Sequence, residues 1–221
     1  RIVKPSVTTI QKVLDKPGLN NWKIEQYLSQ AWELASHDGR VSHALLVLEK
    51  DEWITEVKRL TELQMDAAPS AGSDLHDSLE KYWNEELSKE HADYEICSNA
   101  FSLLKGKSEL PWFVERKFVS DQGYGGQVDL YNNEWIIDFK TKQTKEKFKP
   151  GKMAFVDSHT MQLAAYREGL FHQRGNWPQC ANLFICLENG DMDFHVHSED
   201  ELLRGWKMFY YALKLWELQN L

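Results

Sequence analysis

The chain has 221 residues, of which 42% are hydrophobic, so it is long enough to bury the core of one large or two small domains. No apolar run reaches the roughly eighteen residues of a membrane span and no secretory signal opens the chain, which predicts a soluble, intracellular protein without membrane contact. The net charge of −8 argues mildly against a nucleic-acid partner for the chain as a whole.

The first half of the chain is predicted to be helical. Apolar residues recur at helical spacing in four segments, and strong helix breakers are absent within them. The predicted helices cover residues 22–36, 42–66, 73–90 and 92–104.

The second half alternates between strands and helices. Three strands are predicted over 111–120, 126–131 and 134–140, then a helix over 158–172, two strands over 181–188 and 192–197, and a helix over 199–219. Ser198-Glu199-Asp200-Glu201 matches a capping box at the start of the last helix. This order predicts an α/β (α+β mixed) fold with a central mixed sheet flanked by helices. A helical N-terminal region, 1–105, would pack on a core formed by 106–221.

Asn132-Asn133 predicts a tight hairpin between the second and third strands. This link would place Asp129 opposite Ile136, and because side chains alternate along a strand, Asp129, Asp138 and Lys140 would share one face. The other face would be apolar and consist of Val128, Leu130, Trp135, Ile137 and Phe139.

The two aspartates are suited to binding a metal ion. As diagonal neighbours they would lie roughly 7–8 Å apart at the backbone, a separation that one divalent cation can bridge. Carboxylate ligands favour Mg²⁺ or Mn²⁺. Lys140 would reach the same space, where an ammonium can orient a water molecule and offset charge in a phosphoryl transition state. The pattern predicts the site of a metal-dependent nuclease; the alternative is a solvated hairpin face with a surface Asp/Lys pair.

Positive charge collects around the proposed site. Residues 105–152 hold 10 basic and 7 acidic side chains, whereas 1–104 hold 11 and 18, and 153–221 hold 5 and 9. The segment that follows the third strand contains Lys142, Lys145, Lys147, Lys149 and Lys152. It could track a phosphate backbone, although a solvated basic loop is the alternative.

Cys97, Cys180 and Cys186 form an odd set without the paired spacing of zinc or iron–sulfur ligands. We therefore expect buried thiols in a reducing compartment and no iron–sulfur cluster.

Three separated motifs point to a known family. Residues 72–80 read Gly-Ser-Asp-Leu-His-Asp-Ser-Leu-Glu, with His76 and Glu80 one helical turn apart. Asp129 is followed by Asp138-Phe139-Lys140, and Gln162 by Tyr166. The first is similar to a Gly-x-x-x-His-x-x-x-Glu helix, the second to the nuclease signature and the third to a Gln-x-x-x-Tyr helix. Together they resemble the RecB-like branch of the PD-(D/E)XK nuclease superfamily, whose restriction-endonuclease-like core has the order αβββαβ.

The resemblance extends over nearly the whole chain. The opening Pro5-Ser6-Val7-Thr8-Thr9-Ile10, with Lys16-Pro17 and Trp22, is similar to phage and mitochondrial exonucleases of this group. Those relatives imply a phage-infected or bacterial cytoplasm, or the mitochondrial matrix if a leader has been removed. Val128 stands where the superfamily name has proline, a position that carries no ligand.

The family resemblance implies a metal-dependent DNA exonuclease that acts as a monomer on single strands or free ends. Lys140 would position the attacking water. The implied ligands of Mg²⁺ or Mn²⁺ are His76, Asp129, Asp138, the backbone carbonyl of Phe139 and, as an additional acid, Glu115.

Several neighbouring residues have supporting roles in this interpretation. Glu80 would orient the imidazole of His76, although His76 could also be a hydrogen-bonded core histidine. Gln162 and Tyr166 share a helix face. By resemblance, the amide would hold Lys140 or a phosphate, and the phenol would contact the nucleic acid. Arg116 would contact DNA or pair with Glu115.

Two other functions remain open from the sequence. A structure-specific or restriction-like endonuclease would share the same metal site. A non-catalytic nucleic-acid-binding subunit is the second alternative. A decayed site would be expected to lack at least one of Asp129, Asp138 and Lys140, but the chain contains all three.

Overall fold

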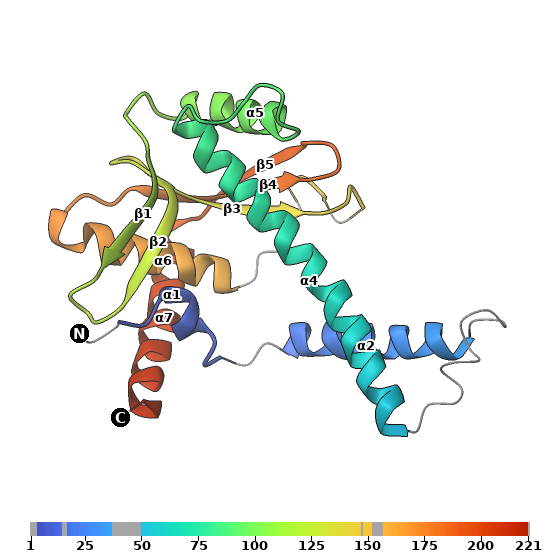
Figure 1. Ribbon diagram of the computed structural model, residues 1–221. Coiled ribbons are helices and arrows are strands. Elements are labelled where there is room, and N and C mark those ends of the chain that lie inside the picture. Colours follow the sequence, from blue (N-terminus) through green and yellow to red (C-terminus); the bar gives the residue numbers. More distant parts are fainter. Residues whose placement is uncertain (1–3, 15–16, 37–49, 147, 152–156, 221) are drawn as a thin grey trace. The chain divides into compact units, whose positions relative to one another are not determined.

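The computed structural model describes residues 4–14, 17–36, 50–146, 148–151 and 157–220 (Figure 1). The chain divides into two compact units. The larger consists of Arg1–Leu14 with Gly72–Leu221, and the smaller of Asp15–Ala71. None of the described helices combines the length and apolar character that crossing a membrane requires. The three cysteines are buried and free of disulfides.

The larger unit is built on a five-stranded sheet in the order β1-β2-β3-β4-β5. The strands are β1 (Phe113–Val119), β2 (Gly125–Tyr131), β3 (Trp135–Lys142), β4 (Gln179–Cys186) and β5 (Met192–Val196). Only β3 and β4 pair in parallel, and the other three pairs are antiparallel. The predicted mixed sheet is thereby confirmed.

Helices cover both faces of this sheet (Figure 1). The helices of the larger unit are α1 (Val7–Gln11), α5 (Tyr94–Lys105), α6 (Asp157–Phe171) with the short 3₁₀ helix η1 (His172–Arg174), α7 (Glu199–Gln219) and the end of α4 (Lys50–Trp83). Ile136 and Cys180 belong to the hydrophobic cluster beside α1, α6 and α7, whereas the adjacent Ile137 and Ala181 belong to the cluster beside α4 and α5. Because neighbouring strand residues point to opposite faces, the sheet is buried on both sides.

Helix α7 begins as its sequence predicts. The Ser198 side chain accepts a hydrogen bond from the backbone N–H of Glu201, and the Glu201 carboxylate accepts one from the backbone N–H of Ser198. This capping box satisfies donors that the first turn of a helix leaves without intrahelical partners.

The smaller unit contains α2 (Pro17–Ser36) and the first part of α4. The two helices predicted over 42–66 and 73–90 differ from the structure: residues 42–49 lie outside the described part, and α4 is one helix through residue 83. Helix α4 continues through segment 67–71 although Pro69 disfavours the interior of a helix. The helix ends before residue 90, because Glu85 takes a left-handed conformation with φ 61°.

The link between β2 and β3 is Asn133-Glu134, one residue later than predicted. The Asn132 side-chain oxygen accepts hydrogen bonds from the backbone N–H groups of Glu134 (2.8 Å) and Trp135 (2.9 Å). This local side-chain turn moves the link along the chain. Ile136 therefore lies opposite Tyr131 instead of Asp129.

The prediction that Val128 and Leu130 share one face is wrong. Leu130 packs in the α4/α5 cluster with Ile137, whereas Val128 packs in the α1/α6/α7 cluster. The paired residues of β2 and β3 are only Leu130 with Ile137 and Tyr131 with Ile136, so the earlier part of β2 is not held in register by β3.

The close packing of α6 against α7 depends on Gly205. A Cβ atom at this position would lie 2.9 Å from the backbone C and O atoms of Thr160.

Alanine gains about 1 kcal/mol of helix propensity over glycine, but overpacking against an immobile backbone costs about 1–3 kcal/mol. We expect Gly205→Ala to lower the free energy of unfolding by about 1 kcal/mol in urea titrations. Lys207→Ala, at an exposed position of α7, should change it by less than about 0.5 kcal/mol. A Gly205→Ala protein as stable as the parent would contradict this description of the interface.

Candidate active site

The site begins where β2 and β3 separate. The next hydrogen-bonded pair of the ladder would join Val128 and Phe139, but the Phe139 N–H donates instead to the Asp129 side chain, at 2.8 Å from Oδ2. The N–H and C=O of one strand residue point toward the same neighbouring strand, so the Phe139 carbonyl faces the same gap. As a hydrogen-bond acceptor, that carbonyl also raises the pKa of the His76 imidazole, against the larger opposite effect of burial. A side chain and a backbone carbonyl thus enter the space between the two strands.

Glu115 stands across from Asp129 on the other side of β2. The β1–β2 register pairs Val114 with Leu130 and Arg116 with Val128, and it omits Glu115, which has φ 48°. A residue other than glycine in the left-handed region costs about 1–3 kcal/mol and occurs preferentially at functional sites. The Glu115 carboxylate accepts a hydrogen bond from the Gln127 amide.

His76 completes a cluster with these two acids. It lies near the end of α4, with its Nδ1 atom 3.7 Å from Asp129 Oδ2 and its ring edge-on to Phe139 at 5.9 Å between centroids. One potential ligand atom from each of His76, Glu115 and Asp129 lies within 4.8 Å of the others. Burial lowers the pKa of His76, which favours the neutral imidazole that binds metals.

A second group of side chains runs from β3 to α6. Lys140 Nζ lies 2.5 Å from Asp138 Oδ2 and donates to Gln162 Oε1 at 3.3 Å. The Gln162 amide in turn donates to the Tyr166 hydroxyl at 2.8 Å. A Cβ atom at Gly126 would lie 2.8 Å from the Tyr166 ring, so the missing side chain allows this phenol to approach the sheet.

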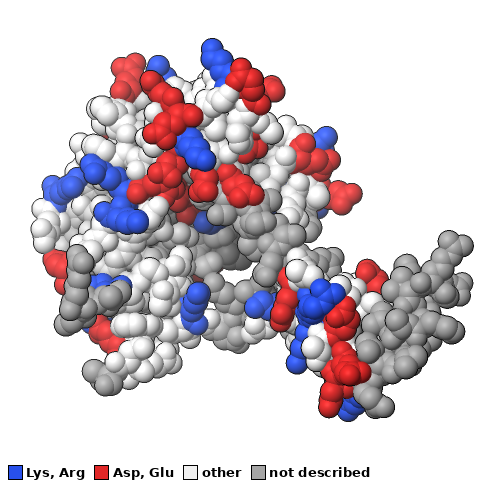
Figure 2. Space-filling model, in the orientation of Figure 1, with Lys and Arg blue, Asp and Glu red and all other residues white. Residues whose placement is uncertain are grey.

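The acids of the site concentrate negative charge. Burial, followed by the charge of Asp138, raises the pKa of Asp129 well above its usual value, against the opposing effects of the Phe139 N–H and Lys140. Burial also raises the pKa of Glu115, and the charges of Glu80 and Asp77 add to this. Figure 2 shows Asp and Glu side chains gathered on the face of the larger unit that carries the end of α4, with Lys and Arg grouped toward β1. A cation at this position would relieve the mutual repulsion of the acids.

His76, Glu115, Asp129 and Tyr166 border one cleft of about 480 Å³, whereas Asp138, Lys140 and Gln162 are not among its lining residues. Its lining residues are Ser6, Val7, Thr8, His76, Asp77, Glu80, Glu115, Gly126, Gln127, Asp129 and Tyr166. The N-terminal segment reaches the cleft because the Gly125 N–H donates to the Pro5 carbonyl at 2.9 Å. All of these residues belong to the larger unit.

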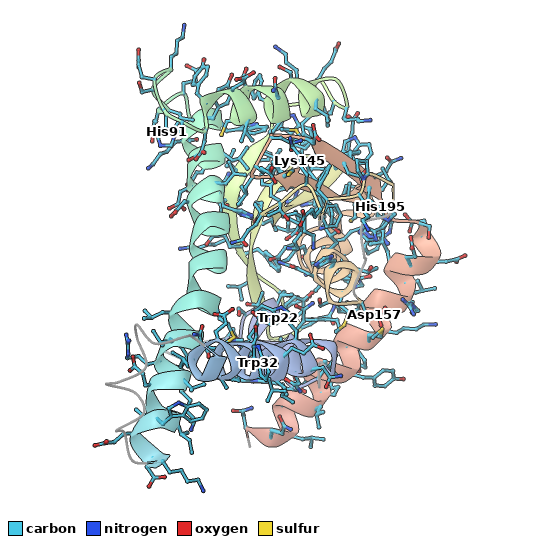
Figure 3. The ribbon with its side chains drawn as sticks, turned by 90° about the vertical axis from the view of Figure 1, so that its right-hand side faces the viewer. Trp22, Trp32, His91, Lys145, Asp157 and His195 are labelled. Carbon is cyan, nitrogen blue, oxygen red and sulfur yellow. The ribbon has the colours of Figure 1, made fainter. Side chains whose placement is uncertain are left out.

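Some predicted site residues lie elsewhere or have other contacts. The guanidinium of Arg116 lies over the Phe113 ring at 5.2 Å. Lys145 is in the loop after β3 (Figure 3), where its backbone N–H donates to Glu188. Lys142 ends β3 and Lys149 is exposed; neither is among the residues that line the cleft. Lys147 and Lys152 lie outside the described residues.

Glu80 was expected to orient His76. It lines the same cleft, where its charge raises the pKa of Glu115. Its role in orienting His76 stays a prediction.

Sequence reasoning missed three residues near this site. Asp77 lines the cleft beside His76, and a position next to a candidate ligand was a weak signal. Asn182 contacts Asp138, and His197 contacts Asn182. Asn182 did carry a signal, because it is a polar residue within the apolar run Cys180–Leu187.

Comparisons with known proteins add little. No family model and no curated protein matches the chain. Among solved structures, the chain is similar to one named "Putative exonuclease" from Eubacterium rectale, with 11% identity and a TM-score of 0.47 over 65% of each chain. It is also similar to SSO0001, with 18% identity and a TM-score of 0.33 over 84% of this chain and 83% of that one. At these TM-scores neither similarity carries a functional conclusion, which must come from the site itself.

The strained backbone at Glu115 leads to a testable difference between two variants. Glu115→Ala and Glu115→Gly both remove the carboxylate, but only glycine adopts a positive φ without steric cost. We expect Glu115→Gly to be more stable than Glu115→Ala by about 1 kcal/mol in urea titrations, because the left-handed conformation costs an L-residue about 1–2 kcal/mol. Equal stability, or a more stable alanine variant, would show that Glu115 is not strained.

Proposed function

We propose that this protein is a metal-dependent nuclease that hydrolyses phosphodiester bonds in DNA. The observation that carries the proposal is the meeting of His76, Glu115 and Asp129 within 4.8 Å in a cleft, beside the paired Lys140 and Asp138. A group of potential metal ligands alone is compatible with many functions, and a lysine–carboxylate pair alone is common. Their combination at the separation of two strands supplies both the cation ligands and the ammonium that phosphodiester hydrolysis needs.

The donor set fits a divalent cation. His76, Glu115 and Asp129 would hold it, with Asp138 and the Phe139 carbonyl as further oxygen donors. Mostly oxygen ligands favour Mg²⁺ or Mn²⁺, and an imidazole is better matched to Mn²⁺. When bound, the ion would polarise the phosphodiester and lower the pKa of a bound water.

The chain's own residues would position the reactants. Lys140 is held between the Asp138 carboxylate and the Gln162 amide, so its ammonium has a fixed place from which to orient water and offset phosphate charge. Burial raises the pKa of Tyr166, so the phenol keeps its proton and can donate a hydrogen bond to a phosphate oxygen.

The nuclease proposal is tested with a labelled single-stranded oligonucleotide in Mg²⁺, Mn²⁺ or EDTA. We expect cleavage that requires metal, and a loss of at least about 100-fold in rate for Asp138→Asn and for Lys140→Ala, because each removes a group of the reacting site. Asp193→Asn, outside the cleft, serves as a matched control and should keep parental activity. Undiminished cleavage by either site variant would contradict the proposed mechanism.

An exonuclease and an endonuclease differ in their need for an end. We infer exonuclease activity from the resemblance of the His76, Asp129 and Gln162 motifs to that group. Linear single-stranded DNA should therefore be degraded, while a closed circle of the same sequence should persist under the same conditions. Circles cut as fast as linear strands would favour the endonuclease alternative and retain the metal site.

A further inference from the structure

Asn182 is a fully buried polar residue in the centre of β4, paired in register with Asp138. Its amide nitrogen lies 2.7 Å from Asp138 Oδ2 and 3.3 Å from the Asp138 backbone carbonyl. A carboxylate only accepts hydrogen bonds, so the NH₂ group of Asn182 must face Asp138 and the amide oxygen must point away. A buried amide is costly unless both of its ends are satisfied.

His197 satisfies the other end of this amide. Its Nε2 atom lies 2.8 Å from Asn182 Oδ1, and its Nδ1 atom lies 3.4 Å from Thr160 Oγ1. Because the Asn182 oxygen accepts, His197 must carry its proton on Nε2, and the Thr160 hydroxyl then donates to Nδ1. Burial and the charge of His195 lower the pKa of His197 to about 4, which matches this neutral ring.

The fold fixes His197 in this position. Its backbone N–H donates to the Cys180 carbonyl at 2.9 Å, and the next residue, Ser198, is the N-cap of α7. Thr160 lies on α6, where Gly205 of α7 packs against it. The chain of hydrogen bonds therefore joins β3, β4, the end of β5 and α6 around one carboxylate.

A second use of His197 can be weighed against this one. His195, His197 and Glu201 each offer a ligand atom within 4.8 Å of the others, which suggests a zinc site (His195 is labelled in Figure 3). Both ring nitrogens of His197, however, already lie at hydrogen-bonding distance from Asn182 and Thr160, and the Glu201 carboxylate accepts from Ser198. A metal on either ring nitrogen of His197 would have to displace one of these two partners, Asn182 or Thr160.

We propose that Asn182 and His197 are positioning residues for Asp138, a role that rests on the proposed nuclease function. Among the described residues, Asn182 and Lys140 both contact Oδ2 of the Asp138 carboxylate. In the proposed role Oδ1 would be the oxygen that faces a cation, and Asn182 would keep the carboxylate from rotating. His197 keeps the Asn182 amide from flipping, since a flipped amide would set its oxygen against the carboxylate.

The test compares two substitutions at His197 and one at Asn182. His197→Gln retains a side-chain N–H that can reach Asn182, whereas His197→Leu does not. We expect His197→Leu and Asn182→Asp to lower kcat by about 10–100-fold with little change in KM, the range found for partners that orient metal ligands. His197→Gln should recover most of the loss. His195→Leu, beside Asn182 in the β4–β5 register, controls for general disturbance and should stay within about twofold of the parent. Equal activity of His197→Leu and the parent, or no difference between the Leu and Gln variants, would overturn the proposal.

A measurement independent of cleavage separates failure of this proposal from failure of the nuclease function. In ¹⁵N spectra of the histidine side chains, His197 should show the Nε2–H tautomer, and its signals should not change when Zn²⁺ is added. An Nδ1–H tautomer, or a Zn²⁺-dependent shift of the His197 nitrogens, would overturn the positioning role even in an active enzyme. The expected tautomer in a protein without nuclease activity would leave the hydrogen-bond chain intact and refute only the proposed function.

Discussion

The hydrogen bond from the Phe139 N–H to the Asp129 carboxylate is the interaction on which the site depends. Antiparallel strands pair most stably along their whole length, so a gap between β2 and β3 needs another partner for the released backbone groups. The Asp129 carboxylate accepts from one of these groups, the Phe139 N–H, and this hydrogen bond also directs the carboxylate into the gap. The Phe139 carbonyl, no longer matched by β2, faces the same space. The separation of β2 from β3 thus determines both the local backbone hydrogen bonding and the oxygen atoms that face the site.

The electrostatics of the site follow from burying several acids together. Asp138 is almost fully buried, and Lys140 Nζ lies 2.5 Å from its Oδ2 atom, so the lysine ammonium already offsets its charge. Burial raises the pKa of Asp129 and of Glu115, and nearby hydrogen bonds and lysines oppose this shift without cancelling it. Two buried carboxyl groups are costly to ionise without a partner. In the proposed nuclease a divalent cation would reverse that cost and would give the strained backbone at Glu115 a functional reason.

Much of the fold could be predicted from the sequence because the signals are local. Runs of β-branched and aromatic residues located β2 and β3, and Ser198 with Glu201 located the start of α7. The missed details come from competing interactions: the Asn132 side chain bonds the backbone and moves the hairpin link, and nothing in a glutamate indicates the positive φ of Glu115. The contact of Asn182 with Asp138 depends on the parallel β3–β4 pairing, which joins residues 44 positions apart. Only the polarity of Asn182 in an apolar strand was visible beforehand.

The charge of the cleft also bears on how a nucleic acid would enter it. Asp77, Glu80, Glu115 and Asp129 line the cleft, and of the lysines expected to hold a phosphate backbone, Lys145 and Lys149 are not among the lining residues. A polyanion would be repelled by such walls until cations neutralised them. The metal would then have two roles in the proposed nuclease, since it would admit the phosphate as well as activate the water. Substrate affinity should consequently depend on the divalent cation, and steering by basic residues would matter less than the sequence alone suggests.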